Sequence, residues 1–263
     1  MISIVMAYHN RFTQTNFTLK TISQTSYLGE VEVIIVDDFS DNPASLDSLS
    51  KDYPALNVKV IKMSELSPSP DVTLNHNRRG RWYYNPCVPY NEGFSQSKGD
   101  KIIIQNPECC HVGDILSYVD SYCNDENYLA FHCLALNQNQ TKDMQVHLNQ
   151  QHYIDFGRGA WYNHKAHRPA AYHFTTAITR NNLKKLNGFD ERFANGKCFD
   201  DDEFIFRVKK LGLRVDFIES PASIHQWHDQ YQGRAPIPWQ KELFDQIQRE
   251  YTQPRVNLDK TVL

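Results

Sequence analysis

The chain has 263 residues, and 28 basic against 31 acidic side chains give a formal net charge of −3 at pH 7. This length fits one large α/β domain or two small ones, and we favour one. A pI near 6.4 gives no overall attraction to nucleic acid, so only the basic cluster at 78–81 leaves that class open. No apolar run is long enough for a transmembrane segment, and the apolar residues 1–6 lack the basic flank of a signal peptide.

The cysteine pattern favours a reducing environment. The chain has six cysteines with no Cys-x-x-Cys pair, namely Cys87, Cys109, Cys110, Cys123, Cys133 and Cys198. Without a secretory context, such cysteines are more often free buried thiols than disulfides. We therefore expect free thiols and a cytoplasmic protein.

The first third of the chain alternates apolar runs with a helical pattern. Residues 2–7 and 31–36 are continuous apolar runs, typical of strands that are buried on both faces. Between them, apolar residues recur at helical spacing from Phe12 to Tyr27. Strand, helix and strand with short connections indicate a βαβ unit, and a third strand is expected at 58–63.

The middle of the chain repeats this alternation after a loop. Residues 64–90 are rich in Ser, Pro, Asn and Arg and have no clear period, which predicts a surface loop. Proline at 107 predicts that the chain leaves the sheet there. The expected elements that follow the loop are a helix at 91–97, a central strand at 101–105, a helix at 114–122 and a strand at 128–136.

The last part opens with a polar stretch. Residues 137–173 are rich in Gln, Asn, His and aromatic residues, and loops of this length usually carry function or disorder. Four consecutive acids, 200–203, then precede an apolar helical pattern. The expected elements are a strand at 174–179, a helix at 181–186 stopped by Gly188, a helix at 202–211, a strand at 214–218 and an amphipathic helix at 239–251.

Polar residues follow three of the predicted strands. They stand at 8–11, at Asp38 and at 106–108. In open parallel sheets, ligands bind beyond the carboxyl ends of the strands, so these groups are expected to converge on a binding site. The alternative is that polar residues merely cap strands where they reach the surface.

Six short motifs in a fixed order resemble a known family. They are SIVMAYHNR at 3–11, VIIVDDFS at 33–40, NEGF at 91–94, NPE at 106–108, AITR at 177–180 and NGFD at 187–190. The first two resemble the opening of the GT-A glycosyltransferases of family 2, and the later ones also resemble the β-1,4-galactosyltransferase pattern. The resemblance covers residues 1 to about 228. The resemblance implies a single α/β GT-A domain with a Rossmann-like, mixed, mostly parallel sheet flanked by helices. It also implies an inverting transferase for a UDP-sugar.

The resemblance assigns donor-binding residues. Asp38 corresponds to the aspartate that accepts a hydrogen bond from the uracil ring, and Arg11 supplies a positive fork for a phosphate. A surface arginine with a solvated head group is the alternative for Arg11. The other donor-binding candidates are Ala7, Tyr8, His9, Asn91 and Asn106.

The metal motif of the family is altered in this chain. Its Asp-x-Asp pattern falls on 106–108, where Asn106 has replaced an acid. Glu108 still offers an oxygen ligand to a divalent cation, and His225 and His228 fall where related sequences bind Mn²⁺. The loss of one charge leaves weaker metal binding, a different donor or loss of activity open.

The acidic cluster supplies the catalytic prediction. Arg207 corresponds to the arginine of the family's Glu-Asp-x-Asp helix, and counting back six residues makes Asp201 the general base. Asp200 then orients the acceptor sugar, while Asp202 and Glu203 are expected to stabilise the first helical turn. An acidic cap on a solvated helix is the alternative for all four.

Acceptor contacts are the least defined part of this prediction. Trp161 is an acceptor-binding candidate through stacking on a sugar ring, and an anchor in the core is its alternative. The acceptor itself is expected to be a glycan or another hydroxyl compound.

The predicted organisation is one domain with three parts. Residues 1–136 form the nucleotide-sugar half, 137–228 the acceptor and catalytic half, and 229–263 a linker with a helix. The predicted partners are a UDP-sugar and a glycan acceptor, with Mn²⁺ or another divalent cation and no nucleic acid. A catalytically silent GT-A domain is the second hypothesis. A nucleotidyltransferase is disfavoured because no glycine-rich phosphate loop with a lysine follows the first strand.

Overall fold

The first strands form where continuous apolar runs are buried, as seen in a computed structural model that describes residues 1–63, 85–147, 160–229 and 238–251. β1 (Ile2–Tyr8) pairs in parallel with β2 (Val31–Asp37), which pairs in parallel with β3 (Val58–Lys62). Helix α1 (Phe12–Ser23) connects the first two strands. The predicted βαβ unit is therefore confirmed.

The sheet continues from β1 through strands of both directions. In the described residues its order is β3-β2-β1-β4-β8-β6-β9-β5, with β7 paired to β6. β1 to β4, β6 and β9 point one way, whereas β5, β7 and β8 run against them, so the mixed, mostly parallel sheet was predicted correctly. The further strands are β4 (Lys101–Gln105), β5 (Cys109–Val112), β6 (Asn127–Ala135), β7 (Ala160–Asn163), β8 (Thr175–Thr179) and β9 (Arg214–His225).

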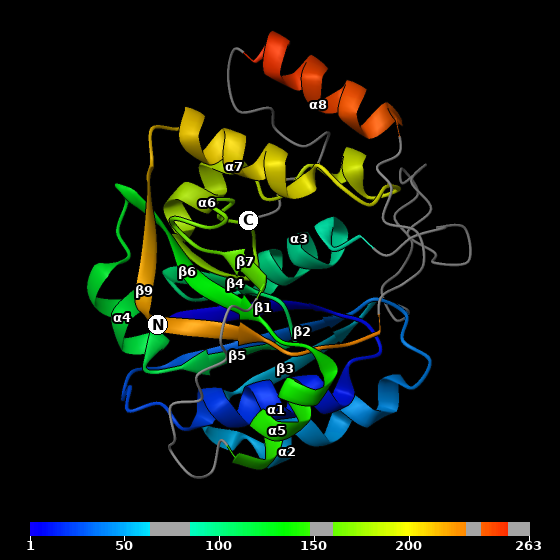
Figure 1. Cartoon of the computed structure of the whole chain (residues 1–263), viewed down its shortest axis with the longest axis vertical. Coiled ribbons are helices and arrows are strands. Elements are labelled where there is room, and N and C mark those ends of the chain that lie inside the picture. The colour runs from blue at the N-terminus through cyan, green and yellow to red at the C-terminus, as the bar shows by residue number, and fades with distance from the viewer. Residues whose placement is uncertain (64–84, 148–159, 230–237, 252–263) are drawn as a thin grey trace.

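Helices cover both faces of the sheet (Figure 1). One face carries α1, α2 (Leu49–Asp52) and α5 (Gln138–His147). The other carries α3 (Cys87–Gln96), α6 (Arg180–Leu186) and α7 (Asp200–Lys210), and α8 (Pro238–Glu250) lies outside α7. In the described parts of the chain, the remaining helical segments are α4 (Ile115–Tyr122), which contacts β9, and three short 3₁₀ turns, Pro43–Ser48, Pro54–Leu56 and Glu191–Phe193.

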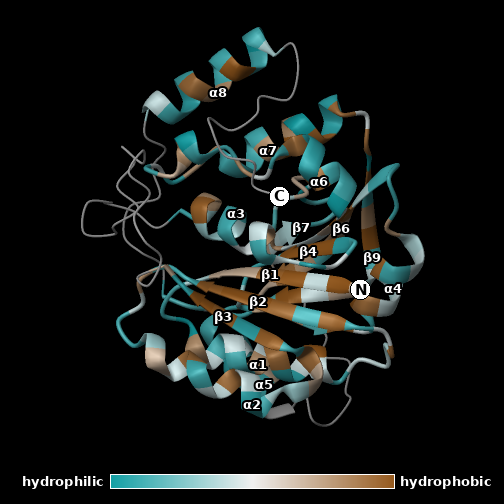
Figure 2. Ribbon diagram, turned by 180° about the vertical axis from the view of Figure 1, so that it is seen from behind, coloured by the Kyte–Doolittle hydropathy of each residue, from teal (hydrophilic) through white to brown (hydrophobic). Residues whose placement is uncertain are grey.

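Each face of the sheet packs its own apolar core. Strand residues alternate between the two sides, so Val5 and Ala7 join the α3 and α7 side, while Ile4 and Met6 join the α1 side. Figure 2 shows the apolar residues concentrated on the central strands. Both faces are thus buried, as the continuous apolar runs predicted.

Local signals set several helix ends. The Asp114 side chain accepts from the backbone N–H of Ser117 at 3.0 Å and caps α4. At the end of α6, Asn187 and Gly188 have φ of 54° and 67°, a left-handed turn that favours glycine. The predicted stop at Gly188 is confirmed, with Asn187 taking part.

Several boundaries differ from the predictions. α5 and β7 lie in the stretch predicted as loop, and α3 begins at Cys87, inside the other predicted loop. β5 was missed because four residues are too few for a periodic signal. β9 continues past Pro221 to His225. Its pairing with β6 shifts register between Phe131 and Cys133, and Pro221 falls within this irregularity.

The cysteines are free thiols, as predicted. All six are free, five are buried, and Cys198 is partly exposed. Among the helices in the described ranges, none is long and apolar enough to cross a membrane. The basic cluster at 78–81 and most of the linker 229–237 lie outside the described residues.

Candidate active site

The strand directions bring the predicted polar tips to one edge of the sheet. β1, β2, β4 and β9 end at this edge, and the opposed strands β5 and β8 begin there. The register pairs Tyr8 with Asp37, Gln105 with Thr175, and Cys109 with His225. Residues 106–108, 173–174 and 225–228, which are far apart in the sequence, therefore meet at the same edge.

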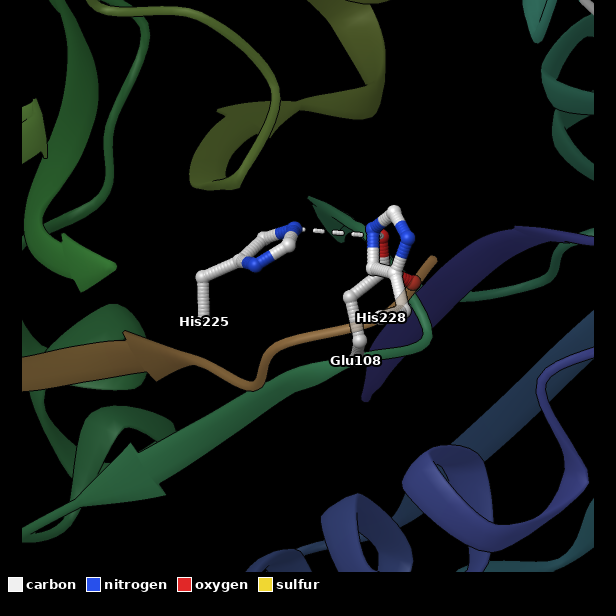
Figure 3. A group of neighbouring side chains, drawn as sticks. All are labelled: Glu108, His225 and His228. Carbon is white, nitrogen blue, oxygen red and sulfur yellow. Dashed lines mark hydrogen bonds and ion pairs between the residues drawn. The ribbon is translucent and has the colours of Figure 1, made fainter. Parts of the chain in front are cut away.

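Three possible metal ligands form a compact group there, which we call the metal trio: Glu108, His225 and His228 (Figure 3). Glu108 precedes β5 and His225 ends β9, so the pairing of these two strands places them together. The Nε2 atoms of both histidines lie 3.1 Å from Glu108 Oε1. One ligand atom from each residue lies within 4.8 Å of the others.

The chemistry of the trio fits a divalent cation. Burial by itself raises the pKa of Glu108, but hydrogen bonds from His225 and His228 outweigh it and hold that pKa well below its ordinary range. The carboxylate is therefore ionised, and imidazole nitrogen with carboxylate oxygen suits Mn²⁺. All three predicted metal ligands are thus brought together.

Arg11 lies beside the metal trio. Its Nη2 is 3.0 Å from His228 Nδ1 and donates to the Asp229 carbonyl at 3.0 Å. The preceding Asn10 is held by Ser40 and Asp41, since its backbone N–H donates to Ser40 Oγ at 3.0 Å. The loops after β1 and β2 are thereby locked together, with the guanidinium next to a candidate metal ligand.

The other donor-binding candidates of the first two strands are largely buried. Asp38 is completely buried, and its N–H donates to the Tyr8 carbonyl at 2.9 Å. The side chain of Tyr8 packs in the core on the α1 side, whereas Ala7 faces the α3 side. His9 is buried next to Asn10. Their roles toward a donor stay predictions.

The two predicted asparagines differ in their surroundings. Asn106 accepts from the Tyr90 hydroxyl at 3.1 Å and keeps its amide N–H groups as donors, which an aspartate lacks. Asn91 is buried, donates to the Phe189 carbonyl and accepts from the Phe189 N–H, at 2.9 and 2.8 Å. These bonds hold α3 against 187–191, so donor binding by Asn91 stays a prediction.

The four acids 200–203 lie within the first turn of α7. This helix begins at Asp200, two residues earlier than predicted, after Phe199 in the left-handed region at φ 69°. Asp201 Oδ1 accepts from the His173 ring Nδ1 and, at 3.2 Å, from the His173 backbone N–H. Asp202 instead accepts from the Tyr172 hydroxyl at 2.5 Å.

Glu203 faces the protein interior. It is buried and pairs with Arg207 through contacts of 2.5 and 2.7 Å. Arg207 also donates to the carbonyls of Leu186 and Gly188. Glu203 thus joins α7 to the end of α6 and does more than stabilise the helix start.

Burial raises the pKa of acids in this run. Burial and the charge of Asp201 raise the pKa of Asp200 to about 7. Burial likewise raises the pKa of Asp202. For His173, burial lowers the pKa, but the negative charges of Asp201, Asp200 and Glu108 outweigh it, so the pKa is raised. His173, Asp200 and Asp201 also offer ligand atoms within 4.8 Å of one another.

Residues 173–174, just before β8, join the two groups. Phe174 packs 5.9 Å from the ring of His225, while His173 holds Asp201. The ring of Tyr90 lies 5.0 Å from that of His173, and its hydroxyl bonds Asn106. The metal trio and Asp201 are therefore connected through the adjacent residues His173 and Phe174.

The predicted acceptor contact Trp161 lies elsewhere. It packs against the small apolar cluster that includes Leu134, Ile224 and Met144, and its ring is 4.3 Å from that of His164. Its neighbour Tyr162 points the other way and lies 4.7 Å from His225. Acceptor binding by Trp161 stays a prediction, and Tyr162 is the aromatic residue of β7 that contacts the metal trio.

Sequence reasoning missed His173 and Tyr90. Tyr90 fell in a predicted loop, and His173 fell in the polar stretch 137–173. The available signal for His173 was its position directly before a predicted strand. This signal could not be used from the sequence. The first residue of a strand lies at the ligand-binding edge of the sheet only when that strand runs antiparallel to its neighbours, as β8 does.

Comparisons with known proteins indicate the fold. No family model matches the chain, and a search of curated proteins finds no match. Among solved structures, S. aureus TarS in complex with UDP matches with a TM-score of 0.59 and 15% identity, over 86% of this chain and 60% of that chain. The Pyrobaculum calidifontis mannosyltransferase PcManGT, in complex with GDP-Man and Mn²⁺, matches with a TM-score of 0.56 and 12% identity, over 96% and 65%.

The matched structures are longer than this chain. It spans only 36% of the longer S. aureus TarS structure, which it matches with a TM-score of 0.58. At these identities the similarity concerns the fold alone. The chain has the GT-A-like fold predicted from its motifs, whereas membership of family 2 and the galactosyltransferase likeness stay predictions.

Proposed function

We propose that this protein is an inverting, metal-dependent glycosyltransferase that moves a hexose from a UDP-sugar to a hydroxyl acceptor. The observation that carries the proposal is the placement of two groups at one sheet edge. The metal trio and Asp201 are linked through two adjacent residues, because Phe174 packs on His225 and His173 bonds Asp201. One group suits the diphosphate of a donor, and the other suits an incoming hydroxyl.

On the donor side, Glu108, His225 and His228 would hold a divalent cation. Such a cation supplies Lewis acidity that stabilises negative charge on the departing diphosphate. Arg11, next to His228, is placed to add a positive fork for the same phosphates. Asp38 reads the uracil ring, and Asn106 bonds a ribose hydroxyl. TarS with UDP-GlcNAc and PcManGT with GDP-Man and Mn²⁺ lend support, because both hold nucleotide sugars on this fold.

On the acceptor side, Asp201 acts as the general base. The acceptor oxygen forms a bond to the anomeric carbon while its proton moves to the Asp201 carboxylate. The bond from the anomeric carbon to the diphosphate breaks, and its electron pair leaves with the diphosphate. Attack from the face opposite the leaving group inverts the anomeric configuration. Asp200 orients the acceptor sugar.

The second candidate function is a catalytically silent domain that binds a nucleotide sugar or glycan. Asn106 favours it, because this residue replaces an acid and lowers the negative charge beside the metal trio. Both candidates share donor binding, so turnover separates them. A cytoplasmic location stays a prediction from the cysteine content.

A panel of UDP-sugars, with GDP-mannose as a base control, tests the proposal. Thermal unfolding with Mn²⁺, with each nucleotide sugar and with both measures binding, because ligands of the native state raise its apparent stability. UDP release from the same mixtures measures transfer to water. We expect one UDP-sugar to raise the melting temperature only with Mn²⁺ and to be hydrolysed slowly. Binding without any release under these conditions, or with added glycan acceptors, would support the silent domain.

A further inference from the structure

His173 lies where it can control the geometry of Asp201. Its ring nitrogen Nδ1 and its backbone N–H both donate to the same oxygen, Asp201 Oδ1. In the part of the chain that the structure describes, no hydrogen bond reaches the other oxygen, Oδ2. The Asp201 side chain is 20% exposed, against 10% for His173. The carboxylate is thus held at one oxygen and accessible at the other.

The ring of His173 is itself fixed by aromatic neighbours. Tyr90 lies edge-on at 5.0 Å and Phe189 edge-on at 5.6 Å. Phe189 is anchored in turn by the buried side chain of Asn91. A buried imidazole packed in this way has few alternative rotamers, so its bond to Asp201 sets the direction of the carboxylate.

The charges around His173 also favour its bond to Asp201. Asp201 lies between two other acids, Asp200 and Asp202, in the first turn of α7, so acidic groups are concentrated there. The groups that act on His173 are Asp201 and Asp200 from α7 and Glu108 from the strand edge, all of them acids. A donor hydrogen on Nδ1 therefore offsets charge where Asp201 has to stay ionised to accept a proton.

We propose that His173 is a positioning residue for Asp201, which holds Oδ1 and reserves Oδ2 for the proton of the acceptor hydroxyl. This inference rests on the proposed function. In the transfer step the acceptor proton moves to Oδ2 as the new carbon–oxygen bond forms and the diphosphate leaves with its bonding electrons. In this role His173 acts through the Asp201 carboxylate and takes no proton itself.

Two variants test this role. His173→Ala removes the ring donor, whereas His173→Asn retains an N–H donor of similar reach. A carboxylate misaligned by about 1 Å can cost up to about 100-fold in rate, so we expect kcat to fall roughly 10- to 100-fold in the alanine variant and less in the asparagine variant. The KM for the donor should stay unchanged. The exposed His167, replaced by alanine, is the matched control.

The conservative variant distinguishes positioning from mere stability. With the folded fraction of each variant measured by circular dichroism, kcat per folded enzyme should fall in His173→Ala and be partly restored in His173→Asn. A general loss of folded protein would lower the folded fraction and leave kcat per folded enzyme unchanged. An alanine variant with the kcat of the wild type would overturn the positioning role.

A measurement without turnover separates this inference from the proposed function. In protein with ¹⁵N-labelled histidine, the titration of His173 should move to lower pH when Asp201 is replaced by asparagine, because the ring loses its charged partner. An unchanged titration would overturn the pair. If the titration moves but no UDP-sugar is ever turned over, the proposed function fails while the pair stands.

Discussion

The metal trio and the acidic run 200–203 differ in how their sequence positions relate to their positions in space. The trio joins Glu108 to two histidines that lie more than a hundred positions later, and the pairing of β5 with β9 brings them to one carboxylate oxygen. The acidic run is continuous in the sequence, yet its members face different partners. Asp201 meets His173, Asp202 meets Tyr172, and Glu203 meets Arg207.

This difference shows that residues adjacent in a helix can have different functions. Successive residues of a helix point about 100° apart, so four acids in one turn reach different surroundings. One becomes a candidate base, and another becomes half of a buried ion pair. Residues at the ends of paired strands, in contrast, share one edge wherever they occur in the chain.

The largest effect on stability is expected at the interior end of the acidic run. Arg207→Ala leaves Glu203 buried without its partner, which typically costs about 3–5 kcal/mol. We therefore expect a fall in the melting temperature on the order of 10 °C. Chemical denaturation measures the free energy of unfolding directly. If the variant unfolds like the wild type, Glu203 is not held by this pair.

The next effect concerns the metal trio. Glu108→Gln keeps the shape of the side chain but removes the charge that a cation requires. A ligand at 100 times its dissociation constant stabilises the native state by about 2.7 kcal/mol, and the variant should lose this Mn²⁺-dependent gain. EDTA should have the same effect on the wild type.

Glu126→Gln, which alters an exposed acid elsewhere, is the control and should keep the response to Mn²⁺. Thermal unfolding with and without Mn²⁺ checks both variants. An undiminished response in Glu108→Gln would place the cation elsewhere.

A smaller effect follows from protonation of Asp200. Its pKa is about 7 in the folded protein, against about 3.9 in an unfolded chain. The folded state binds the proton more tightly, so this residue lowers stability as the pH rises from about 4 to 7 and leaves the full penalty above 7.

Asp200→Asn mimics the protonated form and should raise the free energy of unfolding at pH 8 by on the order of 1–3 kcal/mol. The gain should shrink toward zero near pH 4. Denaturant unfolding at both pH values checks this sign. A variant that is less stable than the wild type at pH 8 would contradict it.

The smallest effect tests how α8 supports the loop before the acids. The buried Gln240 accepts from the Lys197 N–H at 2.9 Å and donates to the Cys198 carbonyl at 2.6 Å. Gln240→Ala should cost about 1–3 kcal/mol, because buried backbone groups lose their partner. Gln246→Ala on the exposed face of the same helix should cost less than about 0.5 kcal/mol. Equal costs would argue against the role of Gln240.

The features that could be predicted from the sequence are those carried by continuous apolar runs or by the order of short motifs. The apolar runs at β1, β2 and β4 gave the sheet, and motif order gave the fold type together with Glu108, His225 and His228. Strand direction could not be derived, because β5 is four residues long and β8 runs antiparallel through a central position. The role of His173 depends on that direction. Trp161 and Tyr162 differ only by the alternation of a strand that lay in a predicted loop.

Asp201→Asn tests the central claim most directly. With a saturating UDP-sugar and Mn²⁺, the rate of UDP release should fall about 10²- to 10⁴-fold, since a general base contributes that factor. The affinity for UDP, measured by calorimetry, should stay at the wild-type value because the metal trio is intact. Release at nearly the wild-type rate with unchanged UDP binding would remove Asp201 from the role of base.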